Sequence, residues 1–103
     1  MNKTIKLIDS YIDEQKLQNT RISKETSEML EELKQAIVSN PMEVTELRKY
    51  IDGLLNLIDT CYKTLENVGE VDNVILNWYD LESQKERKAI FEDIRDTFNQ
   101  ENI

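Results

Sequence analysis

The chain of 103 residues contains no histidine, one cysteine, one proline and two glycines. Histidine is the commonest general base in enzymes and the commonest neutral metal ligand. Its absence excludes catalytic triads that use histidine, zinc sites built from cysteine and histidine, and the Glu-x-x-His di-iron bundle. The two glycines are isolated in the sequence, which also excludes a glycine-rich phosphate loop. We therefore expect no catalytic residue, no cofactor and no metal.

The scarcity of glycine and proline favours helices, because both residues destabilise the interior of a helix. Hydrophobic residues make up 39% of the chain and charged residues 33%, a balance that suits a helical domain. The length is sufficient for one small core. We expect a single all-α domain over residues 1–103, folded as a compact antiparallel bundle of three to five helices.

Long apolar runs are also missing. The first residues contain no apolar stretch of signal-peptide length, and no run of about 18 apolar residues occurs anywhere in the chain. The lone Cys61 cannot form an internal disulfide, and its place in an apolar helical stripe predicts a buried thiol. These features predict a cytoplasmic protein that does not enter a membrane.

The clearest helix is expected over residues 41–68 and forms the predicted centre of the bundle. Its heptad a and d positions are all apolar: Val44, Leu47, Ile51, Leu54, Ile58, Cys61, Leu65 and Val68. Asn40 is the expected N-cap and Pro41 suits the first turn, while Asn67 and Gly69 mark the expected end. Flanking positions widen the apolar face and predict neighbours on two sides: Tyr50, Leu55, Leu57 and Tyr62.

The first forty residues are open to two interpretations. Their apolar residues share one heptad frame, but Gln15, Asn19 and Thr26 interrupt it. The segment is either one helix with three polar layers or two helices that meet near residues 18–21, with Ser23 as the second N-cap. We favour two helices, over residues 3–18 and 22–39, because one helix would be roughly 50 Å long.

Two further helices are expected over residues 72–80 and 83–99. The apolar stripe of the first, which includes Trp78 as an expected core residue, is out of phase with the stripe of the second. The second stripe consists of Ile90, Phe91, Ile94 and Phe98. Residues 83–86 resemble a capping box, so we expect a turn near residues 80–83.

The net charge of −8 disfavours binding to nucleic acid and to anionic membrane surfaces, and is better suited to a basic protein partner. Glu25, Glu28 and Glu32 recur at helical spacing, and we interpret them as a solvated surface. Imitation of DNA would need a contiguous acidic ridge. The mixing of 13 basic with 21 acidic residues disfavours it.

Residues 74–81 carry more apolar and aromatic side chains than one buried helix face requires. Aromatic residues concentrate at the energetic centres of interfaces, so Leu76, Tyr79 and Leu81 are the predicted partner-binding residues. We expect a non-catalytic protein that binds another protein, as a regulator, inhibitor or assembly chaperone. The alternatives are a self-associating structural protein, for example a homodimer, and an immunity-type protein that neutralises a toxin.

Overall fold

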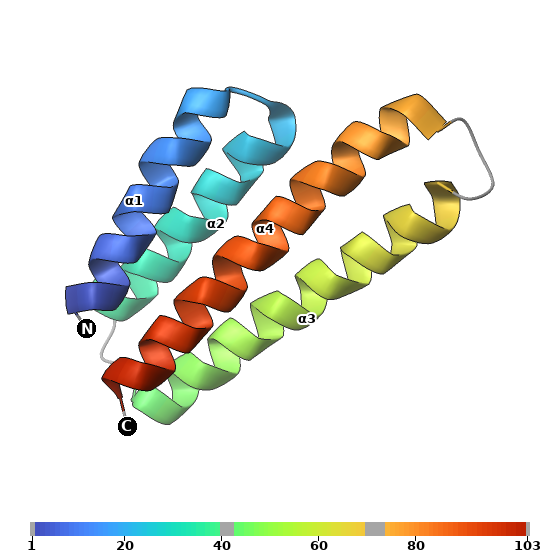
Figure 1. The fold of residues 1–103 in the computed structure, drawn as a ribbon. Coiled ribbons are helices and arrows are strands. Elements are labelled where there is room, and N and C mark those ends of the chain that lie inside the picture. Colours follow the sequence, from blue (N-terminus) through green and yellow to red (C-terminus); the bar gives the residue numbers. More distant parts are fainter. Residues whose placement is uncertain (1, 40–42, 70–73, 103) are drawn as a thin grey trace.

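The computed structural model describes residues 2–39, 43–69 and 74–102, with the side chains of residues 65–81 outside the description. These ranges form four helices and no strand: α1 (Asn2–Gln18), α2 (Arg21–Val38), α3 (Val44–Gly69) and α4 (Val74–Glu101). Successive helices run in opposite directions (Figure 1). The prediction of an all-α antiparallel bundle is confirmed.

The helices form two hairpins of unequal length. Helices α1 and α2 have 17 and 18 residues, whereas α3 and α4 have 26 and 28. At 1.5 Å per residue, the helices of the second hairpin are longer by about 12 to 17 Å. The two chain termini lie at one end of the bundle, and the α3–α4 hairpin continues past the α1–α2 hairpin at the other end (Figure 1).

Helix α4 contacts all three other helices, whereas α3 packs mainly on α4 and contacts α2 over a small area. The long helix predicted over residues 41–68 is therefore present, but α4 takes the central place in the bundle. The physical reason is that α1 and α2 pack closely on each other and are docked together on α4. This arrangement leaves one flank of α3 with little cover.

The apolar core draws side chains from all four helices. Its buried members are Ile8, Ile12, Leu30, Leu33, Leu47, Ile51, Leu55, Ile58, Ile90, Phe91, Ile94 and Phe98. The prediction for Cys61 is wrong, because the structure exposes this residue. Cys61 lies on the poorly covered flank of α3, so its heptad position does not bring it into the core.

The first forty residues form two helices, as favoured from the sequence, but the second N-cap is Thr20 rather than Ser23. Thr20 Oγ1 accepts a hydrogen bond from the Ser23 backbone N–H at 3.0 Å, and Ser23 Oγ accepts one from the Thr20 N–H at 2.8 Å. This reciprocal pair is a capping box. Asn19 completes the turn with a φ of 50°, a conformation that asparagine tolerates better than most residues.

The predicted turn near residues 80–83 is wrong, because α4 is one continuous helix and Ser83 lies inside it. Gln84 and Arg87 are buried between the two apolar stripes, each only 7% exposed, so the inner face of α4 contains a polar section. Two other buried polar residues contact this section of α4. Gln15 on α1 donates a hydrogen bond to Glu86, and Thr26 on α2 accepts one from Arg87.

Helix α3 ends at Gly69, in agreement with the predicted stop. The predicted cap at Asn40 and the first-turn position of Pro41 lie outside the described residues.

Candidate functional site

The predicted partner-binding residues Leu76, Tyr79 and Leu81 belong to the first turns of α4. Their side chains, and that of Trp78, lie outside the described part of the structure. Their role in binding therefore stays a prediction. The described side chains point to a second region, between α2 and α3.

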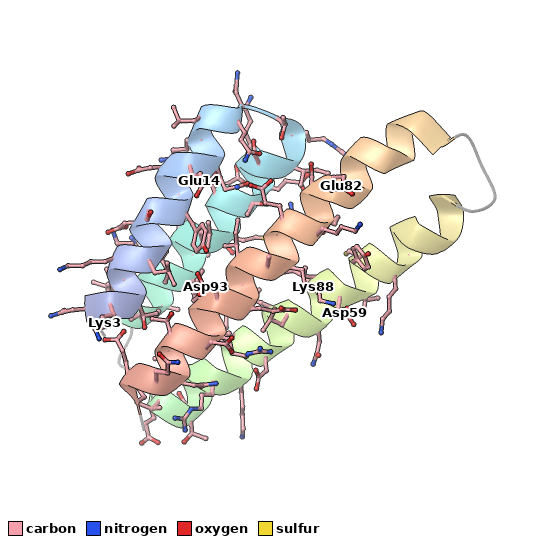
Figure 2. The ribbon with its side chains drawn as sticks, viewed as in Figure 1. Lys3, Glu14, Asp59, Glu82, Lys88 and Asp93 are labelled. Carbon is pink, nitrogen blue, oxygen red and sulfur yellow. The ribbon has the colours of Figure 1, made fainter. Side chains whose placement is uncertain are left out.

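The flank of α3 that faces away from α4 carries a second apolar stripe. It consists of Tyr50, Leu54, Leu57 and Cys61, which recur at helical spacing and so share one face. The opposite flank binds α4, because Asp59 accepts a hydrogen bond from Lys88 at 2.9 Å. Figure 2 shows Asp59 and Lys88 meeting between the two helices. Leu57 is 59% exposed, so this stripe is only partly covered.

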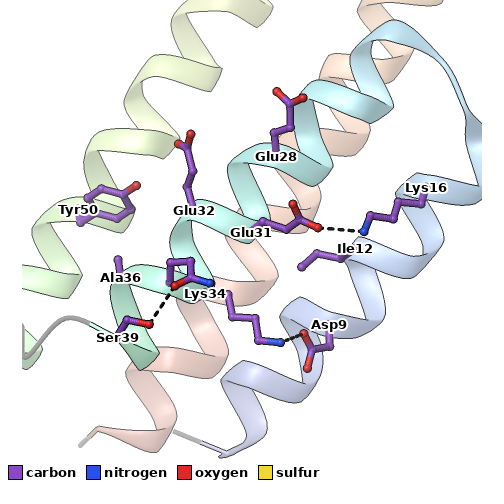
Figure 3. A pocket seen from close by; sticks show the side chains of 11 residues that line it. Asp9, Ile12, Lys16, Glu28, Glu31, Glu32, Lys34, Ala36, Ser39 and Tyr50 are labelled. Carbon is purple, nitrogen blue, oxygen red and sulfur yellow. Dashed lines mark hydrogen bonds and ion pairs between the residues drawn. The ribbon is translucent and has the colours of Figure 1, made fainter.

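One end of this stripe borders a shallow hollow of about 1050 Å³. Tyr50 on α3 and Glu28, Glu32 and Ala36 on α2 are among its lining residues. Figure 3 shows the Tyr50 ring directed from α3 toward α2. Most of the lining belongs to α1 and α2, where Lys34 Nζ and Asp9 Oδ1 form an ion pair at 2.7 Å.

The other end borders a smaller recess of about 330 Å³, which we call the Cys61 recess. It is lined by Arg21, Ile22, Glu25, Thr60, Cys61, Thr64 and Gln84. Glu25 stands one helical turn from Glu28 on α2, so the α2 residues that line the two hollows adjoin along this helix. We call the region between α2 and α3 the α2–α3 groove. Glu25, Glu28, Glu32 and Ala36 lie on its α2 side, and the second apolar stripe of α3 lies on the other, where Tyr50 and Cys61 line the two hollows.

The two walls of the groove differ in character. Glu28 and Glu32 have no ion-pair partner within the described residues, and Glu25 is only loosely paired, with its Oε2 3.4 Å from Arg87 Nη2. By contrast, Glu31 on the α1 side of α2 pairs with Lys16 at 2.9 Å. The α2 wall is therefore acidic with uncompensated charge, and the α3 wall is apolar.

Lys16 lines the α1 side of the larger hollow, and the hydrogen bond that it donates to Glu31 raises its pKa. The other groups with shifted pKa values lie at contacts between helices that line neither wall of the α2–α3 groove. Burial, together with the hydrogen bond that Tyr11 donates to Asp93 at 2.6 Å, raises the pKa of Tyr11 to about 12. Hydrogen bonds from Lys88 and Lys63 lower the pKa of Asp59. Among the described side chains, those of residues 2–39, 43–64 and 82–102, no group of three or more Cys, Asp or Glu residues is placed to hold a metal ion.

One pattern in the sequence anticipates this groove. Tyr50 and Leu57 widen the apolar face of α3 beyond its heptad stripe, which predicted neighbours on two sides. The structure provides α4 on one side and only slight contact with α2 on the other. The surplus apolar surface thus marks the uncovered side of the helix.

No described helix is long and apolar enough to cross a membrane. Comparison of the chain with models of protein families, with curated proteins and with solved structures finds no match.

Proposed function

We propose that this protein is a non-catalytic binding protein that holds a helical segment of another protein in the α2–α3 groove. The observation that carries the proposal is the exposed Leu57, which belongs to the second apolar stripe of α3, while Glu28 and Glu32 line the larger hollow on the α2 side. An exposed apolar surface rimmed by charge is typical of sites for protein partners.

The dimensions of the groove suit a helix. From Tyr50 to Cys61 the second apolar stripe covers about three helical turns, or roughly 16 Å. A partner helix with apolar residues three and four positions apart would pack against this stripe, as amphipathic helices do in other grooves. Lysine or arginine along one edge of that helix would then face Glu28 and Glu32.

Charge favours a different protein over a second copy of this chain. The chain carries a net charge of −8, so a second copy would bring acidic residues to an acidic wall. Like charges facing one another across an interface cost several kcal/mol in general, whereas opposite charges also speed association. A basic partner therefore fits better than a homodimer, and regulation, inhibition or chaperoning of that partner is the expected role.

Leu76, Tyr79 and Leu81 remain the predicted second contact. They lie on the same hairpin as the α3 wall, and a long partner could reach both regions. Replacing Leu76 and Tyr79 with alanine should weaken binding without loss of helix signal in circular dichroism. Unchanged binding would contradict the partner-binding role of Leu76 and Tyr79 and would leave the proposal for the α2–α3 groove unaffected.

The groove itself is tested with two exposed leucines. Leu57→Glu places a charge in the groove, and Leu17→Glu makes the same change at a residue of α1 that is 86% exposed. A partner captured from the native host is purified and titrated against the native chain and both variants. We expect Leu57→Glu to weaken binding by about tenfold or more and Leu17→Glu to change it by less than about twofold. Equal affinities for the two variants would contradict the proposal.

The acidic wall is tested by Glu28→Lys combined with Glu32→Lys. The control combines Asp13→Lys with Asp52→Lys, which are exposed residues that line neither hollow and produce the same change in net charge. We expect Glu28→Lys with Glu32→Lys to slow association with the partner and to reduce the salt dependence of that association more than the control variant does.

Light scattering tests the alternative of self-association. A native dimer that Leu57→Glu dissociates would indicate that the groove binds a second copy of this chain.

A further inference from the structure

The Cys61 recess contains a buried amide that lacks a hydrogen-bond partner. Gln84 is 7% exposed, and its Oε1 is buried without a donor among the described residues. Buried polar groups in folded proteins are nearly always hydrogen-bonded, so each exception needs an explanation. Gln84 also lines the recess, so a rotation of its side chain would present Oε1 to an incoming donor.

The other polar groups of the recess restrict what that incoming group can be. Thr60 Oγ1 donates its proton to the backbone oxygen of Asn56, and Thr64 Oγ1 donates to that of Thr60, both at 2.9 Å. These hydroxyls can therefore only accept further hydrogen bonds. The recess therefore favours a ligand that donates a hydrogen bond and does not need to accept one.

The recess also favours a neutral and largely apolar group. Ile22 and Cys61 supply apolar surface, while Arg21 and Glu25 contribute charges of opposite sign. A second cation would meet Arg21, and an anion would meet Glu25. The recess volume of about 330 Å³ lies within the range of roughly 300 to 1,000 Å³ that small-molecule pockets occupy.

We infer that the Cys61 recess receives a tryptophan side chain of the partner helix, with the indole N–H donating to the Gln84 amide. Tryptophan is the side chain that combines a large apolar body with a single N–H donor and no acceptor. It is also enriched among the residues that dominate binding energy at interfaces. This inference rests on the proposed function, because it identifies the anchor residue of the helix held in the groove.

The test uses indole and 1-methylindole as probes of the purified chain without partner. Cys61 is the only cysteine and is exposed, so its rate of alkylation by iodoacetamide reports occupation of the recess. We expect indole to slow alkylation. We expect 1-methylindole, which lacks the N–H, to require about a fivefold higher concentration for the same protection, as one hydrogen bond predicts. Equal protection by the two probes, or none, would overturn the inference.

Gln84→Met separates a binding role from a structural one. If the amide is kept for a ligand, the variant melts at a higher temperature, because a buried unsatisfied acceptor is gone, and it no longer distinguishes indole from 1-methylindole. If the amide has only a structural role, the variant melts at a lower temperature and the probe ratio is unchanged. That second result would overturn the inference.

Two further variants keep the outcomes distinguishable. Leu57→Glu should weaken partner binding by about tenfold or more while indole still protects Cys61, since Leu57 does not line the recess. If indole fails to protect Cys61 of the native chain while Leu57→Glu still weakens partner binding, the inference is overturned and the proposed function stands. Trp78→Phe tests whether the chain's own tryptophan fills the recess. If added indole protects Cys61 only in this variant, the recess belongs to Trp78 and the inference is overturned.

Discussion

The guanidinium of Arg87 on α4 donates a hydrogen bond from Nε to Thr26 Oγ1 on α2, at 2.8 Å. Both side chains are buried. Arg87 Nη2 also donates to the backbone oxygen of Ile22 at 3.1 Å, and Thr26 Oγ1 donates to that same oxygen at 2.8 Å. This polar cluster joins α4 to the beginning of α2, next to the buried apolar stripe that starts at Ile90.

Thr26→Val should destabilise the fold. Valine keeps the shape of threonine but leaves the Arg87 Nε–H buried without its acceptor. An unsatisfied buried donor costs about 1 to 3 kcal/mol, and more where the group is charged. We expect the free energy of unfolding, measured by urea denaturation, to fall by at least that amount.

Arg87→Met provides the control for Thr26→Val. It removes the buried charge and leaves Thr26 still hydrogen-bonded to the Ile22 backbone oxygen. Replacing a buried ionic group with an apolar one of similar size is often neutral or stabilising. A loss of stability in Arg87→Met as large as that in Thr26→Val would contradict this account of the cluster.

The contact between the two ends of the chain predicts a dependence on pH. The Glu101 carboxylate accepts hydrogen bonds from the hydroxyl and backbone N–H of Thr4 and from the N–H of Lys3. These bonds, that from the Thr4 hydroxyl first, lower the pKa of Glu101 from 4.5 to about 2. A carboxyl whose pKa is lower in the folded state stabilises the fold above its unfolded pKa and loses that effect as the pH falls.

We therefore expect native stability to decrease as the pH falls from 5 toward 2, and Glu101→Gln to remove part of that decrease. The difference in unfolding free energy between the native chain and Glu101→Gln should be largest near neutral pH and shrink in acid. Denaturation at a series of pH values measures it. Two parallel pH profiles would contradict the role given to Glu101.

The N-caps provide a further prediction. Thr20→Ala removes the side chain that caps α2 and should lower the unfolding free energy by about 1 kcal/mol. Ser83→Ala should be neutral or stabilise the protein by a few tenths of a kcal/mol, because Ser83 lies inside α4 and alanine is the better helix former. A larger loss of unfolding free energy in Ser83→Ala than in Thr20→Ala would instead support the turn predicted near residues 80–83.

The parts of the fold that depend on local pattern could be predicted from sequence. The length of α3 follows from its heptad stripe, and the break between α1 and α2 follows from polar residues in the frame. The position of the cap was missed because a capping box is reciprocal, so Ser23 resembles a cap while it occupies the third helical position. Such errors are small, since both residues take part in the same hydrogen bonds.

The remaining errors concern contacts between residues distant in sequence. The continuity of α4 depends on Arg87 finding Thr26 on another helix, and no local pattern contains that information. The exposure of Cys61 depends on how far α2 separates from α3. The groove could be anticipated only as surplus apolar surface on α3, because its acidic wall belongs to a helix placed by α1 and α4.

The register of α3 can be tested with two leucines that stand two residues apart. Leu55 is 8% exposed and belongs to the core, whereas Leu57 is 59% exposed in the groove. Leu55→Ala should lower the unfolding free energy by about 2 to 5 kcal/mol, since it leaves a cavity in packed surroundings. Leu57→Ala should change it by less than about 0.5 kcal/mol, because water already reaches the side chain.

Denaturant titrations of both alanine variants, followed by circular dichroism, measure this contrast. The comparison is well matched, because both variants make the same chemical change within one turn of the same helix, so differences in helix propensity cancel. A loss at Leu57 as large as that at Leu55 would mean that α2 covers this flank of α3 in solution. The α2–α3 groove would then be closed, and a partner helix could enter only by displacing α2.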